Sequence, residues 1–573
     1  MTAFAEAVGT TDLRAPAKRA WILGFCLSLA TALAIISPYA WRGNASGHDF
    51  SFHAASWMDA ATQLREGTLL PRWTERANYG FGEPRFIFYP PISWLLGAAL
   101  SFVAPWAYVP AVFIVLTQTM AGLSALALGR CLFGEREALF FAVCFAANPY
   151  ALLIAYMRSD FAEQLALAFF PLLVLAALRL TGVIPERFQA RRRSVVFLAI
   201  IFATVWLTNA PAGVISSYSL AILFTWLAIK NKSWQPLLQG GAGLALGLGL
   251  AGFYLVPAAY EQSWVNISEA LSPGLQPSQN FLYTAIADPE HNAFNRIASN
   301  VAMLMIILTG VFAAASFPRN KNPTSRPASI GVWATLLVLA VTAAFLMLPV
   351  SGMFWSFLPK LRFVQFPWRW MSILTIPFAC FISATTAQKR GAVSTVIMIA
   401  LAVTLGCTAA YMVRHTWWDA EDIPVLLEAI DNDQGFEGVD EYDPAGDDHS
   451  ALPQKSERFS LSHPAQRGSA TPEAKVHVEH WSAEKAEMRI TTREPVLLSL
   501  RLLNYPAWRV EVNDAAVVPR RMGETAQMIL PLAAGASHVL VQFTRTRDRT
   551  IGGILSAASA LICGLILIAR RRR

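Results

Sequence analysis

The sequence predicts a polytopic α-helical membrane protein with about twelve spans and a small β-sandwich-like domain before the last span. Three observations support this fold class. Hydrophobic residues make up 55% of the 573 residues, charged residues only 15%, and the mean hydropathy is +0.42, whereas an ordinary soluble domain carries about 25% charged residues. Long apolar runs alternate with short basic loops. The segment after residue 475 alternates polar and apolar residues, as half-buried strands do.

The same composition excludes several classes of protein. The chain is too apolar to be disordered and too long to be a disulfide-stapled miniprotein. The net charge of +8 at pH 7 reflects basic loops that orient spans, so we expect no nucleic-acid partner. The six cysteines show no CxxC spacing, so we expect neither a zinc site nor a disulfide framework from them. No P-loop motif is present, which argues against an ATP-driven pump.

A span needs roughly 20 mostly apolar residues. The stretches that we expect to cross the membrane are Trp21–Trp41, Val109–Phe133, Ala138–Met157, Phe161–Leu180, Val195–Leu207, Val214–Ile229, Leu237–Val256, Val301–Phe317, Ile330–Leu348, Trp370–Ala387, Ala392–Val413 and Ile551–Ala569. The first is longer than the apolar core of a signal peptide and ends without an A-x-A site, so we expect it to stay as an anchor.

A further apolar stretch, Phe86–Val103, decides the topology. Basic residues before the first span favour a cytoplasmic N-terminus: Arg14, Lys18 and Arg19. If Phe86–Val103 also crossed the membrane, the basic residues near Arg130 would lie outside and every later loop would change sides. We therefore expect a short interfacial or re-entrant helix, opened by Pro90-Pro91, and both chain ends in the cytoplasm.

This topology defines the domain organisation. Residues 1–413 form a transmembrane domain with an outer loop at 42–90, residues 414–550 an extracytoplasmic domain that is rich in strands from about 475, and residues 551–573 a final span with a basic tail. In the outer domain we expect strands at Val476–Trp481, Val496–Leu502, Trp508–Val512 and Val539–Phe543, with a turn at Asn513-Asp514.

The first outer loop supplies the leading catalytic candidate, Asp49. A carboxylate at the membrane surface can take the proton of an acceptor hydroxyl, which is the task of a general base. The alternative is that Asp49 caps a helix that begins near Phe50. Other polar residues of this loop are candidates for substrate binding: His48, His53, Arg72, Arg85 and Tyr89.

A second group of candidates, Arg158, Asp160 and Glu163, lies where the third span ends. Ionisable residues beside spans are costly and often functional. Asp160 and Glu163 share a helix face at spacing i, i+3, so they can hold a divalent cation or pair with a basic residue. Arg158 can neutralise a phosphate leaving group. The alternative is an ion pair that orients two spans.

The outer loop before the tenth span holds a third group: Arg362, Gln365 and Arg369. These residues form a candidate phosphate site. Tryptophan and phenylalanine residues surround them, so an aromatic belt with interfacial arginines is the alternative.

Several short motifs occur in a particular order along most of the chain: His48-Asp49, Pro71-Arg72-Trp73, Gly80-Phe81-Gly82, Phe88-Tyr89-Pro90-Pro91, Asn148-Pro149-Tyr150, Arg158–Glu163, Glu437-Gly438, Glu441–Pro444 and Asn504–Trp508. In this order the chain resembles the large bacterial GT-C glycosyltransferases. It is most similar to the YfhO-like branch and to membrane proteins with a domain related to 6-pyruvoyl-tetrahydropterin synthase. The chain shows no soluble pterin-synthase module with its zinc histidines, so that family description implies no pterin activity.

The resemblance implies a GT-C-like transmembrane domain and an inverting glycosyltransferase that uses a polyprenyl-phosphate-linked sugar. The family's acidic catalytic residue in the first outer loop maps to Asp49, and a second acidic position, which helps to bind metal or acceptor, maps to Asp160. The implied cofactor is a divalent cation, Mg²⁺ or Mn²⁺. The implied partners are the lipid-linked donor, the bilayer and a glycan, lipid or protein acceptor. The implied location is the bacterial inner (cytoplasmic) membrane, with the active site on the periplasmic face.

Two other functions stay open. A transporter or flippase of lipid-linked saccharide predicts ionisable residues at mid-span and inverted repeats, whereas the ionisable residues here gather at one membrane face. A membrane scaffold whose β-domain binds a protein partner is the third possibility.

Overall fold

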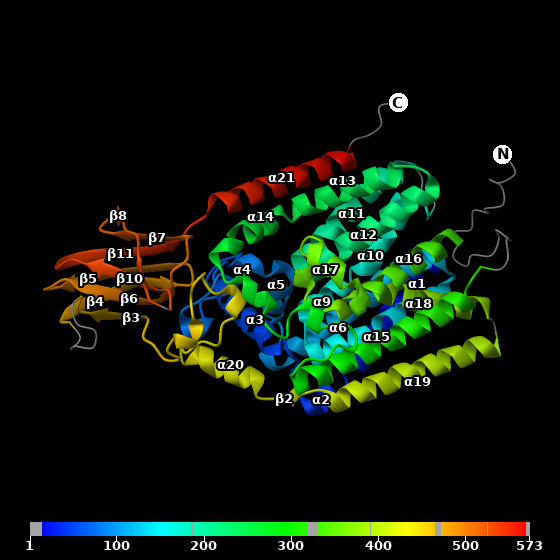
Figure 1. Ribbon diagram of the computed structural model, residues 1–573, viewed down its shortest axis with the longest axis horizontal. Helices are drawn as coiled ribbons and strands as arrows, with labels where there is room; N and C mark the ends of the chain where they lie inside the picture. The colour runs from blue at the N-terminus through cyan, green and yellow to red at the C-terminus, as the bar shows by residue number, and fades with distance from the viewer. Residues whose placement is uncertain are drawn as a thin grey trace.

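The computed structural model describes residues 14–184, 188–318, 330–389, 391–464, 472–523 and 525–568. It contains a helical body and, at one end of it, a sheet domain of two packed sheets (Figure 1). The helices are α1 (Arg14–Ile36), α2 (Tyr39–Arg42), α3 (Phe50–Arg65), α4 (Arg85–Phe88), α5 (Pro91–Leu100), α6 (Val109–Leu132), α7 (Glu135–Ala146), α8 (Pro149–Leu153), α9 (Phe161–Leu167), α10 (Phe170–Leu180), α11 (Phe188–Thr208), α12 (Ala210–Asn231), α13 (Gln235–Leu250), α14 (Gly252–Tyr260), α15 (Pro289–Ala315), α16 (Ile330–Leu346), α17 (Gly352–Phe357), α18 (Met371–Gln388), α19 (Ala392–His415), α20 (Asp422–Asp431) and α21 (Arg547–Ile568).

The helical body confirms the prediction of a polytopic membrane protein. Within the described residues, nine helical stretches are long and apolar enough to cross a membrane, and up to eleven if each of two bent pairs counts as one span. One bent pair joins α13 to α14 at 75°, and the other joins α16 to the segment Pro349–Phe357 at 91°. The predicted span Val195–Leu207 lies in α11, whose apolar stretch Arg193–Thr208 is shorter than these. The orientation across the bilayer stays a prediction.

The expected short helix after Pro90 is present as α5. It begins at Pro91, where the missing N–H group costs nothing, and ends at Leu100. At a rise of about 1.5 Å per residue, its ten residues extend only half-way across a hydrocarbon core of about 30 Å. A helix of this length is suited to a re-entrant or interfacial position rather than to a full crossing.

The third and fourth predicted spans meet at a corner, residues 154–160, where the helix is interrupted. This corner shapes the candidate site. Asn148 caps α8 by accepting a hydrogen bond from Ala151 N at 2.9 Å. The chain then forms a π-helical turn, η3 (Ile154–Arg158), which ends at Ser159 in the left-handed conformation with φ 51°. Asp160 caps α9 by accepting from Glu163 N at 2.9 Å. Such π-helical turns are rare and often lie at functional sites.

The sheet domain contains two antiparallel sheets, as the alternating pattern predicted. One sheet has the order β3-β6-β10-β9 and the other the order β4-β5-β11-β7-β8. The strands are β3 (Phe459–Ser462), β4 (Ala474–Ser482), β5 (Lys485–Thr492), β6 (Val496–Leu503), β7 (Trp508–Val512), β8 (Ala515–Ala516), β9 (Arg520–Met522), β10 (Gln527–Leu532) and β11 (Gly535–Phe543). Asn513 and Asp514, with φ 48° and 63°, form the expected turn between β7 and β8.

The outer loops and the sheet domain are joined by specific pairings. The strand β1 (Asn44–Ala45), just after α2, pairs with β2 (Trp418–Asp419), just after α19. Arg72 Nη2 lies 2.5 Å from Glu484 Oε2 in the sheet domain. Arg549, at the start of α21, donates two hydrogen bonds of 2.8 Å to the buried Glu261 carboxylate. The Arg72–Glu484 pair thus links the first outer loop to the sheet domain, and the other two pairings tie the segments before and after that domain to the helical body.

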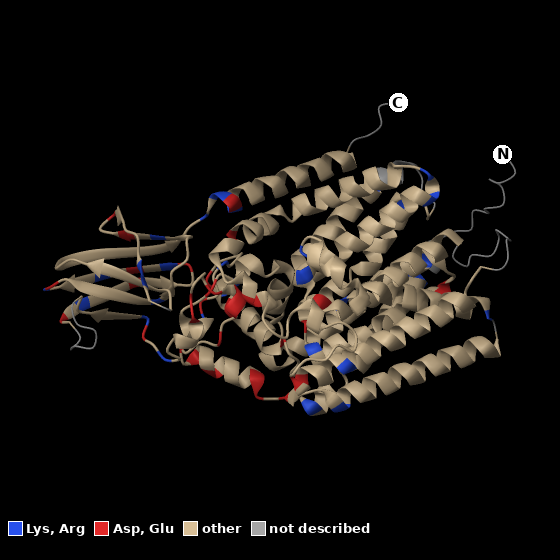
Figure 2. Ribbon diagram, in the orientation of Figure 1, with Lys and Arg blue, Asp and Glu red and all other residues tan. Residues whose placement is uncertain are grey.

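Charge is unevenly distributed over this arrangement. Acidic residues gather around α20 and around the junction between the helical body and the sheet domain (Figure 2). Lysine and arginine residues mark several turns at the opposite end of the helices. The acidic end is therefore the end that carries the first outer loop and the sheet domain.

Candidate functional site

Asp49 lies directly before α3 but does not cap it. The helix begins at Phe50, and the Asp49 side chain makes no capping hydrogen bond. Instead Arg158 Nη2 donates to Asp49 Oδ2 at 2.5 Å. The capping alternative therefore does not describe this carboxylate, which pairs with an arginine from another segment.

Backbone contacts fix the position of the Asp49 loop. Asp49 N donates to the Arg158 carbonyl oxygen at 2.9 Å. Gly47 N donates to Ser159 Oγ at 3.0 Å, and this hydroxyl donates to the Ala45 carbonyl oxygen at 2.8 Å. Gly47 has no space for a side chain, because an added Cβ would lie 2.5 Å from the Arg158 carbonyl carbon. The loop is thus tied to the corner after η3 at Gly47 and at Asp49 itself.

The Arg158 side chain is buried against two aromatic rings, Phe366 and Trp368. Its guanidinium carbon lies 5.0 Å from the centre of the Phe366 ring and 5.6 Å from that of the Trp368 ring. The residue is 5% exposed, and its Nε atom has no hydrogen-bond partner among the described residues. A cation held in this way keeps donor capacity for an anionic group.

Asp160 and Glu163 form an ion-pair network with Arg369. Arg369 Nη2 lies 3.1 Å from Asp160 Oδ2, and Arg369 Nε lies 3.1 Å from Glu163 Oε2. The hydroxyl of Tyr150 donates to the other Glu163 oxygen. Arg158 Nη2 is 3.8 Å from Asp160 Oδ2. The network connects α8, α9 and the turn η9 (Pro367–Trp370) beneath Asp49.

These contacts leave little capacity for a metal ion at Asp160 and Glu163. Asp160 Oδ1 accepts from the backbone of Glu163 and Oδ2 from Arg369. Both Glu163 oxygens accept hydrogen bonds from Tyr150 and Arg369. A divalent cation would have to displace the Arg369 guanidinium, so the donor set does not fit a metal ion as it stands. The geometry matches the alternative of a structural ion pair.

His53, Tyr89 and His48 border this network. His53 Nε2 lies 3.5 Å from Asp160 Oδ1, and the residue is 1% exposed. The Tyr89 ring packs edge-on against the His53 ring at a centroid distance of 5.8 Å. His48 is exposed at the other side of Asp49, and its ring packs against Phe294 at 4.6 Å.

The electrostatics differ among these groups. Burial alone raises the pKa of the Asp160 carboxyl, but His53, Arg369 and Arg158 lower it more, so the pKa lies below its ordinary value. Asp160 is therefore a fixed anion. Burial, and then Asp160 and Asp49, raise the pKa of the Tyr89 hydroxyl.

The structure brings only some of the predicted residues to the site. Gln365 accepts a long hydrogen bond of 3.5 Å from Arg369 Nη1 and donates to the Ala270 carbonyl oxygen. Arg362 is exposed and lies against the Phe363 ring. Arg72 pairs with Glu484 in the sheet domain. Arg85 is buried and pairs with Glu83 at 2.5 Å.

Sequence reasoning did not assign roles to Tyr150, Phe366 and Trp368, which complete the site. Tyr150 belongs to the Asn148-Pro149-Tyr150 motif, and the helix cap that this motif forms was a signal for its inward position. The two rings stack on each other at 5.0 Å and lie against the Arg158 guanidinium. Their position follows from the turn η9, which the sequence does not distinguish from an aromatic belt.

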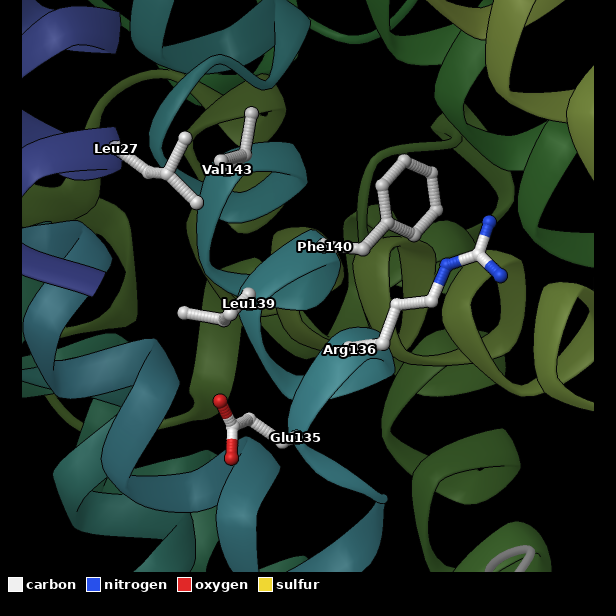
Figure 3. A pocket seen from close by; sticks show the side chains of 6 residues that line it. All are labelled: Leu27, Glu135, Arg136, Leu139, Phe140 and Val143. Atoms are coloured by element: carbon white, nitrogen blue, oxygen red, sulfur yellow. The ribbon is translucent and has the colours of Figure 1, made fainter. Parts of the chain in front are cut away.

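A separate cavity of about 470 Å³ opens between α1 and α7 (Figure 3). Its lining residues are Leu27, Glu135, Arg136, Leu139, Phe140 and Val143. None of the predicted site residues is among them. This apolar cavity is therefore distinct from the candidate site at Asp49.

Comparisons with known proteins give the following similarities. The arabinofuranosyltransferase AftD from mycobacteria is 16% identical, with a TM-score of 0.41 over 70% of this chain and 28% of that one. The archaeal oligosaccharyltransferase AglB from Archaeoglobus fulgidus, in complex with an inhibitory peptide and a dolichol-phosphate, is 13% identical, with a TM-score of 0.39 over 73% of this chain and 56% of that one. The chain thus spans little more than half the length of AglB and less of AftD. No curated protein matches the chain.

A family model gives a match over most of the helical body. It covers residues 86–413 of the 573, which is more than half of the chain. This region includes α5, the broken corner with Arg158 and Asp160, and the turn that carries Arg369. The chain belongs to the family of membrane proteins described by the 6-pyruvoyl-tetrahydropterin synthase related domain.

Proposed function

We propose that this protein is a glycosyltransferase that moves a sugar from a polyprenyl-phosphate-linked donor to an acceptor hydroxyl at the outer face of the membrane, with Asp49 as the general base. The observation that carries the proposal is the contrast among the acids of the site. The Asp49 side chain is 29% exposed, whereas those of Asp160 and Glu163 are 4% and 3% exposed. Of these three acids, only Asp49 is open enough for an acceptor to reach it. It also lies 2.5 Å from the buried arginine Arg158.

The reaction requires one proton acceptor and one stabiliser of a departing phosphate. Asp49 accepts the proton of the acceptor hydroxyl while the hydroxyl oxygen forms a bond to the anomeric carbon of the donor. The bond from that carbon to the phosphate oxygen breaks, and its electron pair leaves with the prenyl phosphate. Attack from the face opposite the phosphate inverts the anomeric configuration.

Arg158 has the properties that the departing phosphate needs. Its guanidinium is fixed by the Phe366 and Trp368 rings, and its Nε atom is a free donor among the described residues. A positioned cation that meets charge as it develops lowers the barrier without reorganisation. When phosphate takes hydrogen bonds from Arg158, Asp49 is released to accept the proton.

The buried network below these two residues positions them. Asp160, 3.8 Å from Arg158 Nη2, orients the guanidinium, and Arg369 offsets the charges of Asp160 and Glu163. His53 lies beside Asp160, and the Tyr89 ring packs against the His53 ring. No step of this mechanism uses a metal ion, because the carboxylates of Asp160 and Glu163 are already paired.

The site lies at the acidic end of the helical body, next to the sheet domain. A lipid-linked donor reaches such a site from the adjacent leaflet while the acceptor arrives from outside. We place the protein in the bacterial inner membrane, with this end on the periplasmic side, and the sheet domain guides a glycan, lipid or protein acceptor.

The proposal is tested with the full chain purified in detergent and short-chain prenyl-phosphate sugars. Release of prenyl phosphate is compared for the wild type, Asp49→Asn and Asp431→Asn, which changes an exposed acid at the end of α20. We expect the loss of the base to lower turnover by about 10²-fold or more and the control to keep the wild-type rate. Equal rates in Asp49→Asn and wild type would remove Asp49 from the mechanism. Translocation of a lipid-linked saccharide across vesicles without transfer would show a flippase instead.

A further inference from the structure

The cavity of about 470 Å³ between α1 and α7 is apolar along its length and charged at one end. Its apolar lining comes from α1 and from one face of α7: Leu27, Leu139, Phe140 and Val143. The charged end is formed by Glu135 and Arg136, the first two residues of α7. Arg136 and the apolar residues of α7 follow the spacing i, i+3, i+4, i+7, so they share one side of that helix.

This cavity lies at the end of the helical body opposite the candidate site. The helix α6 begins beside the first outer loop, since Asn44 Nδ2 donates to the Ala107 carbonyl oxygen at 3.3 Å just before it. Its 24 residues extend about 36 Å, so Leu132 and the start of α7 lie at the far end. There the Arg130 guanidinium carbon lies 5.4 Å from the centre of the Trp21 ring. Tryptophan prefers the head-group level of a bilayer, so the charged end of the cavity lies at that level.

The two charges at this end are of opposite sign but do not pair with each other. Glu135 and Arg136 are both exposed, and their side chains form no ion pair or hydrogen bond with the described residues. Figure 3 shows the carboxylate and the guanidinium pointing to different sides of the start of α7. Topology accounts for an arginine here and the helix dipole for a glutamate. Neither accounts for their position at the end of an apolar cavity.

We propose that this cavity binds one glycerophospholipid whose head group carries both a phosphate and a primary ammonium. The phosphate accepts hydrogen bonds from Arg136, the ammonium donates to the Glu135 carboxylate, and an acyl chain lies along α7 toward Val143. From Arg136 to Val143 the helix rises about 10 Å, so the contact stays within one leaflet of a hydrocarbon core of about 30 Å. The site is separate from Asp49, and its test does not depend on sugar transfer.

Charge complementarity selects this head group over two others. A head group with a phosphate alone leaves Glu135 facing an anion, which is unfavourable. A quaternary ammonium has no N–H group to donate to the carboxylate. An apolar cavity that faces a bilayer takes up acyl chains in any case, so the pair of opposite charges is what distinguishes one lipid from another.

Other basic residues near the same end of the helices do not line the cavity: Lys18, Arg19, Arg130 and Lys230. Their summed charge attracts anionic lipids without a defined site. Lys230 is exposed in the last turn of α12. Its replacement therefore removes one cation and leaves the cavity intact, which makes Lys230→Gln the matched control.

The experiment uses the full chain, delipidated in detergent and studied by native mass spectrometry. It is titrated with phosphatidylethanolamine, phosphatidylglycerol or phosphatidylcholine, all with the same acyl chains, and bound lipids are counted. The variants are Arg136→Gln, Glu135→Gln, Val143→Phe and the control Lys230→Gln. The melting temperature without lipid checks the fold of each variant, and the changes at positions 135 and 136 affect exposed side chains only.

We expect the wild type and Lys230→Gln to bind one phosphatidylethanolamine at least about fivefold more tightly than either other lipid, the scale of one hydrogen bond. Arg136→Gln should weaken phosphatidylethanolamine at least about fivefold. Glu135→Gln should abolish its preference over phosphatidylglycerol, because the carboxylate no longer takes the ammonium or repels the anionic lipid. Val143→Phe should weaken all three lipids, because the larger ring occupies the place of the acyl chain.

Three results would overturn the proposal. Tightest binding of phosphatidylglycerol by the wild type would mean that general positive charge selects the lipid. An unchanged preference for phosphatidylethanolamine in Glu135→Gln, or unchanged affinity in Arg136→Gln, would place the head group elsewhere. A dimer that Val143→Phe dissociates would assign the cavity to a second copy of the chain.

Discussion

Arg158 donates a hydrogen bond of 2.5 Å to Asp49, a residue 109 positions earlier in the chain. The pair joins the start of α3 to the corner between η3 and α9, and it places a candidate base beside a candidate phosphate ligand. Each partner restrains the other. The Asp49 carboxylate pairs with Arg158 and does not cap α3, and the Arg158 guanidinium stays 3.8 Å from Asp160. The first prediction follows from this pair.

Replacement of Arg158 is expected to lower transfer while the fold persists. Arg158→Gln removes the positive charge at the departing phosphate, so we expect turnover to fall by about 10²- to 10³-fold. Arg158→Lys keeps the charge but loses the planar fork of donors, so its rate should lie between those of wild type and Arg158→Gln. Initial rates of prenyl phosphate release measure this. Arg362→Gln, which changes an exposed arginine, serves as the control, and an equal loss there would contradict a special role for Arg158.

Replacement of Arg369 is expected to act on stability first. Arg369→Met leaves the buried Asp160 and Glu163 carboxylates without their counter-charge, and removal of one partner of such a buried network costs about 3–5 kcal/mol. Chemical unfolding in detergent should show this loss. The triple variant Asp160→Asn, Glu163→Gln, Arg369→Met removes all three charges, so it should recover much of the stability. A triple variant no more stable than Arg369→Met would argue against the ion-pair account.

The close contact at Gly47 gives a steric prediction. A Cβ at this position would lie 2.5 Å from the Arg158 carbonyl carbon and 2.6 Å from the Met157 carbonyl oxygen, and neither backbone atom can yield freely. Gly47→Ala should therefore displace the Asp49 loop and lower turnover by about 10²-fold, the scale of a misplacement of about 1 Å. The matched control is Gly310→Ala in α15, where a Cβ meets no atom within 4 Å. Wild-type turnover in Gly47→Ala would show that the loop position is unimportant.

Asp59, in α3, gives a pH-dependent prediction. Burial raises the pKa of its carboxyl from 3.8 to about 6, although Arg76 lowers it. The folded protein thus binds the proton more tightly than the unfolded chain does, so this carboxyl reduces stability progressively as the pH rises from 3.8 to about 6. Asparagine has no charge to bury. The free energy of unfolding of Asp59→Asn, relative to wild type, should therefore rise by up to about 3 kcal/mol over that range.

Unfolding of Asp59→Asn and wild type is to be compared in detergent at both ends of this pH range. The exposed Asp431→Asn variant is the control, since its stability relative to wild type should not change with pH. A constant difference between Asp59→Asn and wild type would mean that the Asp59 carboxyl titrates normally.

Parts of the fold could be predicted because they depend on local sequence and on the thickness of a bilayer. Long apolar runs are stable only where hydrocarbon or protein surrounds them, and the predicted spans are largely helical, although Ala138–Met157 and Leu237–Val256 are each broken into shorter helices. Pro90-Pro91 marked the start of α5, since proline favours a first helical turn. Asn513-Asp514 marked a hairpin, since these residues tolerate positive φ. The strands outside the clearest alternation, such as β3 and β10, depend on their pairing with β6.

The candidate site was predictable only in part. By itself, the sequence determined that acids and arginines gather near span ends on one side of the protein, because charges are excluded from the apolar runs. It did not determine which arginine meets which acid. Arg362 and Arg369 share one loop and the same aromatic surroundings, yet Arg362 is exposed and Arg369 is buried between Asp160 and Glu163.

Tertiary structure made that choice through backbone geometry. Positive φ at Gln365 (62°) and the turn η9 direct Arg369 inward, and the left-handed Ser159 turns Asp160 back toward it. The pairing of Arg158 with Asp49 likewise needs the loop after β1 to pack on the corner after η3. Such contacts join segments that are distant in the chain, and their energies depend on a burial and a geometry that exist only after the helices have packed.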